Sequence, residues 1–274
     1  MQIGVATFIT DEGIGPADLG RALEERGFDS LFVAEHSHIP ASRETPYPAG
    51  GDLPRIYYRT LDPFVALTAA AVVTTRLQVA TGVALAIQRD VIHTAKEVAS
   101  LDLVSGGRFL FGVGAGWNIE EMRDHGTDPA TRGRRLDETL VALKRIWADE
   151  KAEFHGEHID FEPMFAWPKP APRTPIYIGG GSKAALRRVV EHGDGWLALA
   201  VPPKVISQTR QHFDDQGRGD AKIAFFGCPP KAEAIAGYQE AGVDHLTLML
   251  PTLPKDETLS TLDEFAQLAA KFTA

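Results

Sequence analysis

The segment Glu35-His36-Ser37-His38 carries the side chains with the most versatile chemistry in the chain. It directly follows an apolar, strand-like run. A histidine at a strand end can transfer a proton near neutral pH or form a hydrogen bond to a bound ring. Histidines only two residues apart, with one carboxylate nearby, are a weak metal signal, so we predict no metal site. From these residues alone, a solvated pair that caps a strand end is the simpler interpretation.

Two stretches in which a strand runs directly into glycines could let a bulky ligand approach the backbone. In the first, Phe109–Val113 is followed by Gly114-Ala115-Gly116. Its spacing does not fit a dinucleotide-binding turn, and close packing between elements is the simpler interpretation. In the second, Gly179-Gly180-Gly181-Ser182 joins a strand to a helix. Its N–H groups and hydroxyl suit an anion, and a tight turn with Ser182 as helix cap explains it equally well.

A third stretch, Thr81-Gly82-Val83, ends another apolar run. A small residue at a buried strand end is the simpler interpretation, and a bulge beneath a flat ligand is the functional one. The pair Glu120-Glu121 is interpreted as a solvated helix face. The sequence contains no G-x-S-x-G and no H-E-x-x-H motif, so neither nucleophilic hydrolysis nor zinc catalysis is indicated.

These candidates must be positioned by a chain in which apolar, strand-like runs alternate with amphipathic helical stretches. The eight predicted strands are mostly apolar, as expected when both faces of a parallel sheet are covered. They favour a (β/α)8 TIM barrel, with an open doubly wound sheet as the alternative. We expect one domain over residues 1–274, with insertions after the second strand (35–59) and between the fourth and fifth strands (152–175). Loops after barrel strands form the active-site face, so the first insertion is a candidate lid.

The composition bounds the class of protein. The 274 residues carry a formal net charge of -9, which gives no electrostatic footprint for nucleic acid or for an anionic membrane. The single cysteine, Cys228, excludes an intramolecular disulfide. No apolar run is long enough to cross a bilayer, and the first residues lack the basic region of a signal peptide. We therefore expect a cytoplasmic enzyme that acts on a small molecule.

Together, the motifs resemble those of the bacterial luciferase-like group of flavin- and deazaflavin-dependent oxidoreductases. The resemblance covers nearly the whole chain, in order. It rests on Leu61-Asp62-Pro63-Phe64, LQVATGV (77–83), LDLVSGGRFLFGVGAGW (101–117), IYIGGGS (176–182) and Asp194-Gly195-Trp196. It implies a luciferase-like (β/α)8 barrel with an isoalloxazine-like ring at the carboxyl-terminal mouth.

The resemblance also implies roles for individual residues. Glu35 and His36 would form the acid–histidine pair that contacts the ring, with His36 as the candidate for proton transfer, although Asp is more usual than Glu at the first position. Trp117 and His38 would line the substrate pocket. Three features would hold the cofactor: a bulge beneath the ring, a strand end beside the ring and a phosphate-binding turn. In this family the bulge often contains a cis peptide bond. These cofactor residues would be Thr81, Gly82, Val83, Gly114, Ala115, Gly116, Gly179, Gly180, Gly181 and Ser182.

Three functions are compatible with this resemblance. We expect a coenzyme F420-dependent oxidoreductase that transfers a hydride between the deazaflavin and a small organic substrate. The alternative is an FMN-dependent monooxygenase that uses reduced flavin and O2. The third is a barrel that binds the cofactor but has lost its substrate site. The expected partners are a second copy in a homodimer and a flavin or F420 reductase.

Overall fold

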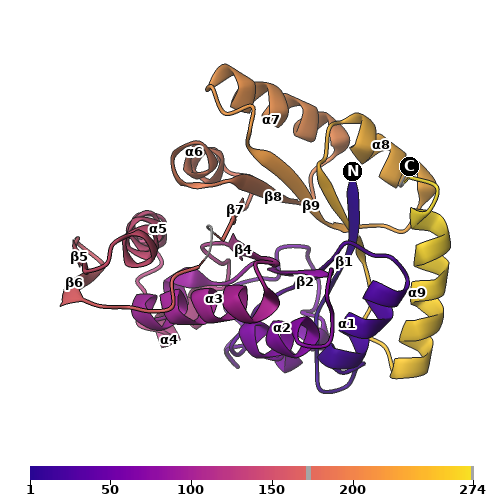
Figure 1. The fold of residues 1–274 in the computed structure, drawn as a ribbon, viewed down its shortest axis with the longest axis horizontal. Coiled ribbons are helices and arrows are strands. Elements are labelled where there is room, and N and C mark those ends of the chain that lie inside the picture. Colours follow the sequence, from indigo (N-terminus) through magenta and orange to yellow (C-terminus); the bar gives the residue numbers. More distant parts are fainter. Residues whose placement is uncertain (171–173, 273–274) are drawn as a thin grey trace.

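Eight parallel strands close into a barrel in the computed structural model, which describes residues 1–170 and 174–272 (Figure 1). Their order around the barrel is β1-β10-β9-β8-β7-β4-β3-β2, so strands that follow one another along the chain are neighbours in space. The connecting helices lie on the outer side of the barrel. This architecture confirms the predicted (β/α)8 barrel and excludes the open doubly wound sheet.

The barrel strands are β1 (Gln2–Thr7), β2 (Ser30–Val33), β3 (Gln78–Thr81), β4 (Phe109–Val113), β7 (Ile176–Gly179), β8 (Gly195–Leu199), β9 (Lys222–Cys228) and β10 (His245–Met249). The α-helices of the described residues are α1 (Pro16–Glu25), α2 (Pro63–Ala71), α3 (Val91–Ser105), α4 (Ile119–Asp124), α5 (Arg132–Ala148), α6 (Lys183–His192), α7 (Pro203–Asp215), α8 (Ala232–Glu240) and α9 (Lys255–Ala269). Two 3-10 turns, η1 (Arg55–Arg59) and η2 (Ala86–Gln88), follow β2 and β3. Within this part of the chain, no helix has both the length and the apolarity needed to cross a membrane.

Aspartates fasten the amino-terminal rim of the barrel. Asp29, Asp194 and Asp244 each stand just before a strand, and each carboxylate accepts a hydrogen bond from an isoleucine N–H at the start of the neighbouring strand. The N···O distances are 2.7 to 2.9 Å. These bonds satisfy backbone donors that the strand ladder leaves open and hold the strands in register. The opposite rim is left for the loops that follow the strands.

Buried side chains from seven of the eight barrel strands fill the barrel interior: Ala6, Phe32, Ala80, Leu110, Tyr177, Leu197, Ala224 and Phe226. From β10, the partly buried Met249 packs against them. A larger apolar cluster packs between the strands and the surrounding helices. Because the interior is a packed core, a ligand cavity has to lie at a rim of the barrel.

Two helices of the structure, α7 and α4, carry only weak signals in the sequence. Helix α7 is mostly polar, and only Ile206, Thr209 and Phe213 are buried. Their spacing of three and four residues is helical and could have indicated the helix. Helix α4 is six residues long and buries two glutamates, which no hydrophobic pattern predicts.

Both predicted insertions are present. The first insertion (residues 35–59) contains η1 and is fastened to the loop after β1 by ion pairs from Arg55 to Glu12 and from Arg59 to Asp11. The second forms a hairpin of β5 (Ala152–His155) and β6 (Asp160–Met164), an antiparallel pair beside α5 (Figure 1). Only the first insertion follows a barrel strand at the carboxyl-terminal rim.

Candidate active site

A cavity of about 560 Å³ opens where strands β3, β4, β7 and β8 end. Three glycine-containing stretches that are far apart in the sequence meet in its wall. The predicted residues that line it are Gly82, Val83, Gly114, Ala115, Gly116, Trp117, Gly179, Gly180, Gly181 and Ser182. The barrel therefore brings together the residues that the sequence singled out for a ring and its phosphate.

The side chain of Val83 is seated between two of these glycines. The Gly82–Val83 peptide bond is cis. A Cβ atom on Gly114 or Gly179 would lie 2.8 or 2.6 Å from the Val83 side chain, and one on Gly82 would lie 2.5 Å from the ring of Phe226. Side chains at these three positions would collide with their neighbours, so close packing requires glycine there. The same packing presents Val83 to the cavity.

Thr81 belongs to the barrel wall and does not line the cavity. It is fully buried, and its hydroxyl donates a hydrogen bond to the carbonyl oxygen of Gly112 at 2.7 Å. A Cβ atom on Gly112 would lie only 2.0 Å from the Thr81 carbonyl oxygen, so β3 and β4 approach closely here. Of the predicted bulge residues, Gly82 and Val83 line the cavity, whereas the Thr81 hydroxyl is engaged inside the wall.

The turn after β7 forms a polar end of the cavity. Gly180 has a φ of 104°, a conformation that favours glycine, and the indole N–H of Trp196 donates to its carbonyl oxygen at 2.7 Å. The Ser182 hydroxyl accepts a hydrogen bond from the N–H of Ala185 at 3.2 Å and so caps α6. N–H groups at the start of a helix favour a bound anion, so capping and anion binding are compatible at this turn.

Arginines that were not predicted as site residues add positive charge near this turn. Arg188 lines the cavity and is held by Asp137, at 2.5 Å from Nε to Oδ1, and by the carbonyl oxygen of Gly133 at 3.0 Å. Arg132, at the start of α5, also lines the cavity. Apolar residues missed by the prediction line it as well: Leu136, Leu197, Leu199 and Phe226. The last three lie on predicted strands that lead into the active-site rim, which is a signal that could have identified them.

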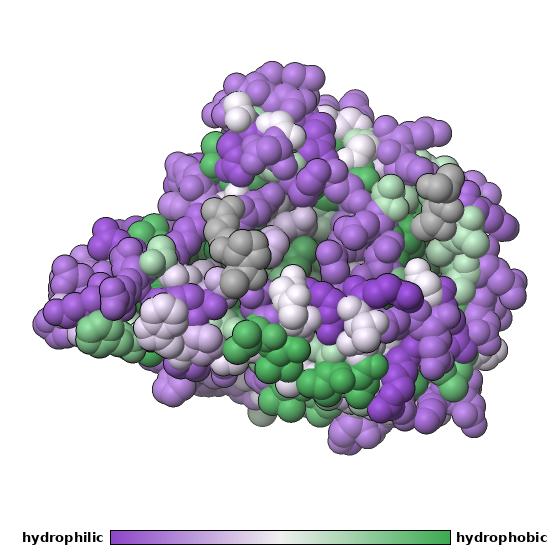
Figure 2. Space-filling view, in the orientation of Figure 1, coloured by the Kyte–Doolittle hydropathy of each residue, from purple (hydrophilic) through white to green (hydrophobic). Residues whose placement is uncertain are grey.

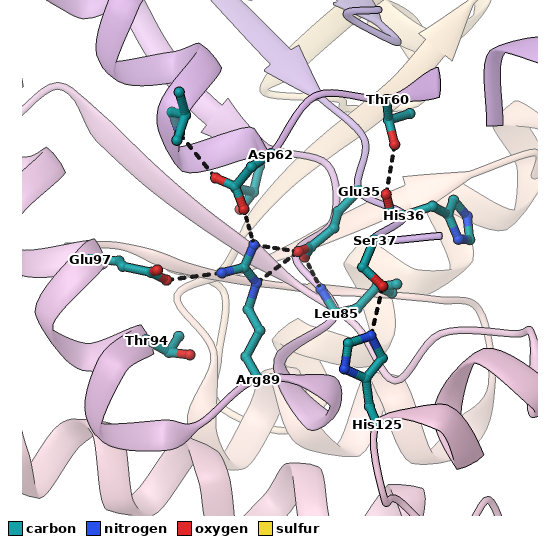
Figure 3. A network of polar contacts seen from close by, with 12 residues as sticks. Glu35, His36, Ser37, Thr60, Asp62, Leu85, Arg89, Thr94, Glu97 and His125 are labelled. Atoms are coloured by element: carbon teal, nitrogen blue, oxygen red, sulfur yellow. Dashed lines mark hydrogen bonds and ion pairs between the residues drawn. The ribbon is translucent and has the colours of Figure 1, made fainter. Parts of the chain in front are cut away.

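The carboxylate of Glu35 is engaged in a buried polar network (Figure 3). One oxygen accepts the N–H of Leu85 at 2.6 Å, and the other accepts from Nε of Arg89 at 2.7 Å. Arg89 also pairs with Asp62 and Glu97. Burial alone would lower the pKa of Arg89, but the attraction of Glu35 outweighs it and raises that pKa above its usual value. The structure thus gives Glu35 a part in holding the loop after Val83, since its two oxygens accept from Leu85 and Arg89.

The carboxylate that contacts His36 belongs to Glu121, from α4. The distance from His36 Nδ1 to Glu121 Oε2 is 2.8 Å, and both side chains are buried. The other oxygen of Glu121 accepts the N–H of Ser37 at 3.2 Å. The imidazole packs against Tyr57 and Trp117, with ring centroids 5.2 and 5.7 Å away. His36 is thus in contact with Trp117 of the cavity lining, while its own side chain lines a second cavity of about 340 Å³ together with Ser37 and His125. The interpretation of Glu121 as a solvated residue is wrong, because its side chain is fully buried.

His38 lies outside the cavity. Its Nε2 is 2.9 Å from Asp124 Oδ2, its Nδ1 is 2.9 Å from the Ser37 hydroxyl, and its side chain is 39% exposed. The Ser37 hydroxyl also contacts Nε2 of His125 at 2.6 Å (Figure 3). The structure therefore places His38 against α4 and does not bring it together with the predicted residues that line the cavity.

The first insertion is attached to α4 and packs over Trp117. The N–H of Thr45 donates to Glu120 at 2.8 Å, and its hydroxyl donates to the second oxygen. Burial raises the pKa of Glu120, but the bonds from Thr45 outweigh this effect and lower it to about 2. Tyr47 and Tyr57 pack edge-on against Trp117, with centroids 6.2 and 6.4 Å away. The insertion thus holds the aromatic wall of the cavity in place.

The chain is similar to known proteins along most of its length. Residues 16–229 match the family described as luciferase-like monooxygenase. An uncharacterized protein of Mycobacterium tuberculosis is 36% identical over 278 residues, which cover 97% of this chain and 98% of that protein. The F420-dependent glucose-6-phosphate dehydrogenase of Nakamurella multipartita is 29% identical over 202 residues, which cover 69% of this chain and 54% of that enzyme.

Solved structures share the fold. An F420-dependent secondary alcohol dehydrogenase, solved with an F420-acetone adduct, superposes with a TM-score of 0.80 at 18% identity and covers 100% of this chain and 99% of its own. The monooxygenase RslO1 from Streptomyces bottropensis superposes with a TM-score of 0.76 at 19% identity over 100% of both chains. At such identities the likeness shows the fold alone, whereas the match over residues 16–229 and the near full-length relative show descent. The chain therefore belongs to the luciferase-like monooxygenase family of oxidoreductases.

Proposed function

We propose that the protein is a coenzyme F420-dependent oxidoreductase that exchanges a hydride with a small organic substrate. The observation that carries this proposal is a cavity in which an apolar wall meets an anion-binding turn. Relatives named F420-dependent glucose-6-phosphate dehydrogenase support the choice of cofactor.

The residues of the cavity fit a flat ring with an anionic tail. Val83 and the backbone of Gly114-Ala115-Gly116 offer a wall with few side-chain atoms. The Gly180-Gly181-Ser182 turn would bind a phosphate through N–H groups and a hydroxyl, and Arg188 would add positive charge. When bound, the deazaflavin supplies the hydride acceptor or donor, while the protein supplies orientation and exclusion of water.

Hydride exchange at a carbinol or carbonyl carbon is accompanied by proton exchange at its oxygen. His36 is our candidate for this proton, because an imidazole changes charge near neutral pH and its ring lies directly against Trp117 of the cavity wall. Glu35 is not a candidate, since Leu85 and Arg89 occupy its two oxygens.

The charge distribution of the cavity indicates a neutral substrate. Among the described lining residues, the arginines lie on α5 and α6, by the turn that would hold the cofactor's phosphate. The remaining wall, with Val83, Trp117, Leu197, Leu199 and Phe226, is apolar. We therefore propose an uncharged, largely apolar alcohol or carbonyl compound as substrate.

An anaerobic titration of the purified protein with oxidised F420 and, separately, with FMN tests the choice of cofactor. We expect saturable binding of F420, measured by the change in its absorbance and by quenching of protein fluorescence. Binding of FMN at micromolar concentration without binding of F420 would overturn the proposal.

An FMN-dependent monooxygenase is the second candidate. It is favoured by the family description and by the turn at Gly180-Gly181-Ser182, which suits the phosphate of FMN as well. Oxygen consumption that requires FMN and a flavin reductase would decide for this candidate. The absence of such consumption, together with F420 binding, would decide against it.

A homodimer is our proposal for the assembly. Val65 and Val72, on and at the end of α2, and Ile92, Leu103 and Val104 of α3 are exposed. Figure 2 shows hydrophobic surface in the region of α2 and α3. Adjacent exposed apolar side chains of this kind favour burial against another surface. We define these five residues as the α2–α3 face and propose that a second copy covers it.

A further inference from the structure

We infer that Glu121 is a positioning residue that fixes the proton of His36 on Nδ1 and leaves Nε2 to exchange protons with the substrate. The inference rests on the proposed function for its catalytic meaning. Its structural content, which ring nitrogen carries the proton, stands independently of any cofactor.

The two oxygens of Glu121 face two different donors. Oε1 is 3.2 Å from the N–H of Ser37, and Oε2 is 2.8 Å from Nδ1 of His36. An ionised carboxylate only accepts hydrogen bonds, so Nδ1 must be the donor in this contact. The side chain of Glu121 is 0% exposed and that of His36 is 6% exposed, so water does not compete freely for either atom. The contact therefore selects the Nδ1–H form of the neutral ring.

Nε2 of His36 is left free by this arrangement. Among residues 1–170 and 174–272, no hydrogen bond to Nε2 is formed, and the ring lies edge-on to Trp117. A neutral ring with its proton on Nδ1 presents a lone pair at Nε2, which is the form of a general base. With a bound deazaflavin as hydride acceptor, Nε2 would take up the hydroxyl proton of an alcohol substrate as the carbonyl compound forms. In the reverse direction, Nε2 of the imidazolium would return that proton to the carbonyl oxygen.

The substitution Glu121→Gln is a sharp test, because the backbone N–H of Ser37 can only donate. This N–H group therefore donates to the amide oxygen of the new glutamine, and the amide NH2 group then faces Nδ1 of His36. Facing a donor, Nδ1 must become an acceptor, and the proton moves to Nε2. The variant thus switches the tautomer of His36 without moving the ring, because glutamine has nearly the same shape as glutamate.

The experiment is nitrogen NMR of the protein labelled with 15N-histidine, without cofactor, at about pH 9, where an ordinary imidazole with a pKa of about 6.5 is neutral. His36→Gln assigns the His36 signals among those of the nine histidines. We expect the Nδ1–H form in the wild type and the Nε2–H form in Glu121→Gln. Glu120→Gln is the matched control, because the neighbouring glutamate is also buried but binds Thr45, and we expect the wild-type form there.

An Nε2–H ring in the wild type would overturn the inference, even if the variant did not fold. An unchanged ring in a folded Glu121→Gln would overturn it as well. Once turnover is measurable, we expect Glu121→Gln to lower kcat about 10- to 100-fold with little change in KM. Failure of F420 to bind would instead overturn the proposed function and leave the NMR result intact.

Discussion

Glu35 and Arg89 form a buried ion pair, with 2.5 Å between Oε1 of the carboxylate and Nη2 of the guanidinium. The pair lies behind the loop that carries Val83 into the cavity, because the second oxygen of Glu35 holds the N–H of Leu85. Glu35 and His36 are adjacent at the end of β2, yet their side chains serve different partners. Glu35 shapes the wall that would hold the cofactor, and His36 is bound to Glu121.

Glu35→Gln is expected to lower the free energy of unfolding by about 2 kcal/mol. Glutamine still accepts the N–H of Leu85, but Arg89 loses one of its charged partners and retains Asp62 and Glu97. Urea unfolding measures the change. Glu12→Gln, which breaks a surface ion pair with Arg55, is the control and should change stability little. An unchanged free energy of unfolding in Glu35→Gln would contradict the stabilising role of this ion pair.

Ser182→Asp is expected to weaken F420 binding by at least about tenfold. Aspartate caps a helix as well as serine does, so α6 remains intact, but its charge repels a phosphate at the turn. Ser182→Asn is the matched control, since asparagine caps equally well and is neutral. We expect Ser182→Asn to bind within about threefold of wild type. Equal affinity of both variants would remove the phosphate from this turn.

His245 is expected to make the fold sensitive to acid. Burial lowers the pKa of His245 to about 4, and its Nε2 lies 2.6 Å from the Ser30 hydroxyl. The unfolded chain binds this proton below about pH 6.5, whereas the folded chain binds it only near pH 4. Stability is therefore lost as the pH falls from about 6.5 to about 4.

His245→Gln should remove this part of the pH dependence. Between pH 7.5 and pH 5, we expect the wild type to lose on the order of 2 kcal/mol more than the variant, measured by urea unfolding. His93→Gln replaces an exposed histidine, with a side chain 85% exposed, and should behave as wild type. If the free energy of unfolding changed with pH equally in His245→Gln and wild type, His245 would bind a proton as readily in the folded as in the unfolded chain.

Leu103→Glu is expected to convert a dimer into a monomer, because it places a charge in the α2–α3 face. Leu103 is 65% exposed on α3, so the substitution leaves the core of the barrel untouched. Sedimentation equilibrium gives the mass of the assembly. Phe165→Glu, at a position 69% exposed beyond β6, is the control and should leave the mass unchanged. A wild-type protein that sediments as a monomer would refute the proposed homodimer.

Much of the barrel could be predicted because its signals are local. Apolar runs separated by helical periodicity indicated the strands. Asp62, a residue type that favours helix starts, caps α2 by accepting the N–H of Val65 at 3.0 Å. Helix α7 escaped the same reasoning because only Ile206, Thr209 and Phe213 mark its buried side. A sparse apolar stripe gives a weak periodic signal even when the helix is required between two parallel strands.

The amino-acid sequence by itself determined the eight strands and the glycine stretches after three of them. These depend on the conformational freedom and hydrophobicity of neighbouring residues. Only the tertiary structure decided which carboxylate serves His36. Successive side chains at a strand end point to opposite sides, so the side chains of Glu35 and His36 diverge. The carboxylate that contacts His36 belongs to Glu121, 85 residues further along the chain. The pairing of His36 with Glu121 depends on which loops lie side by side at the rim of the closed barrel. The spacing of residues along the chain does not predict which loops these are.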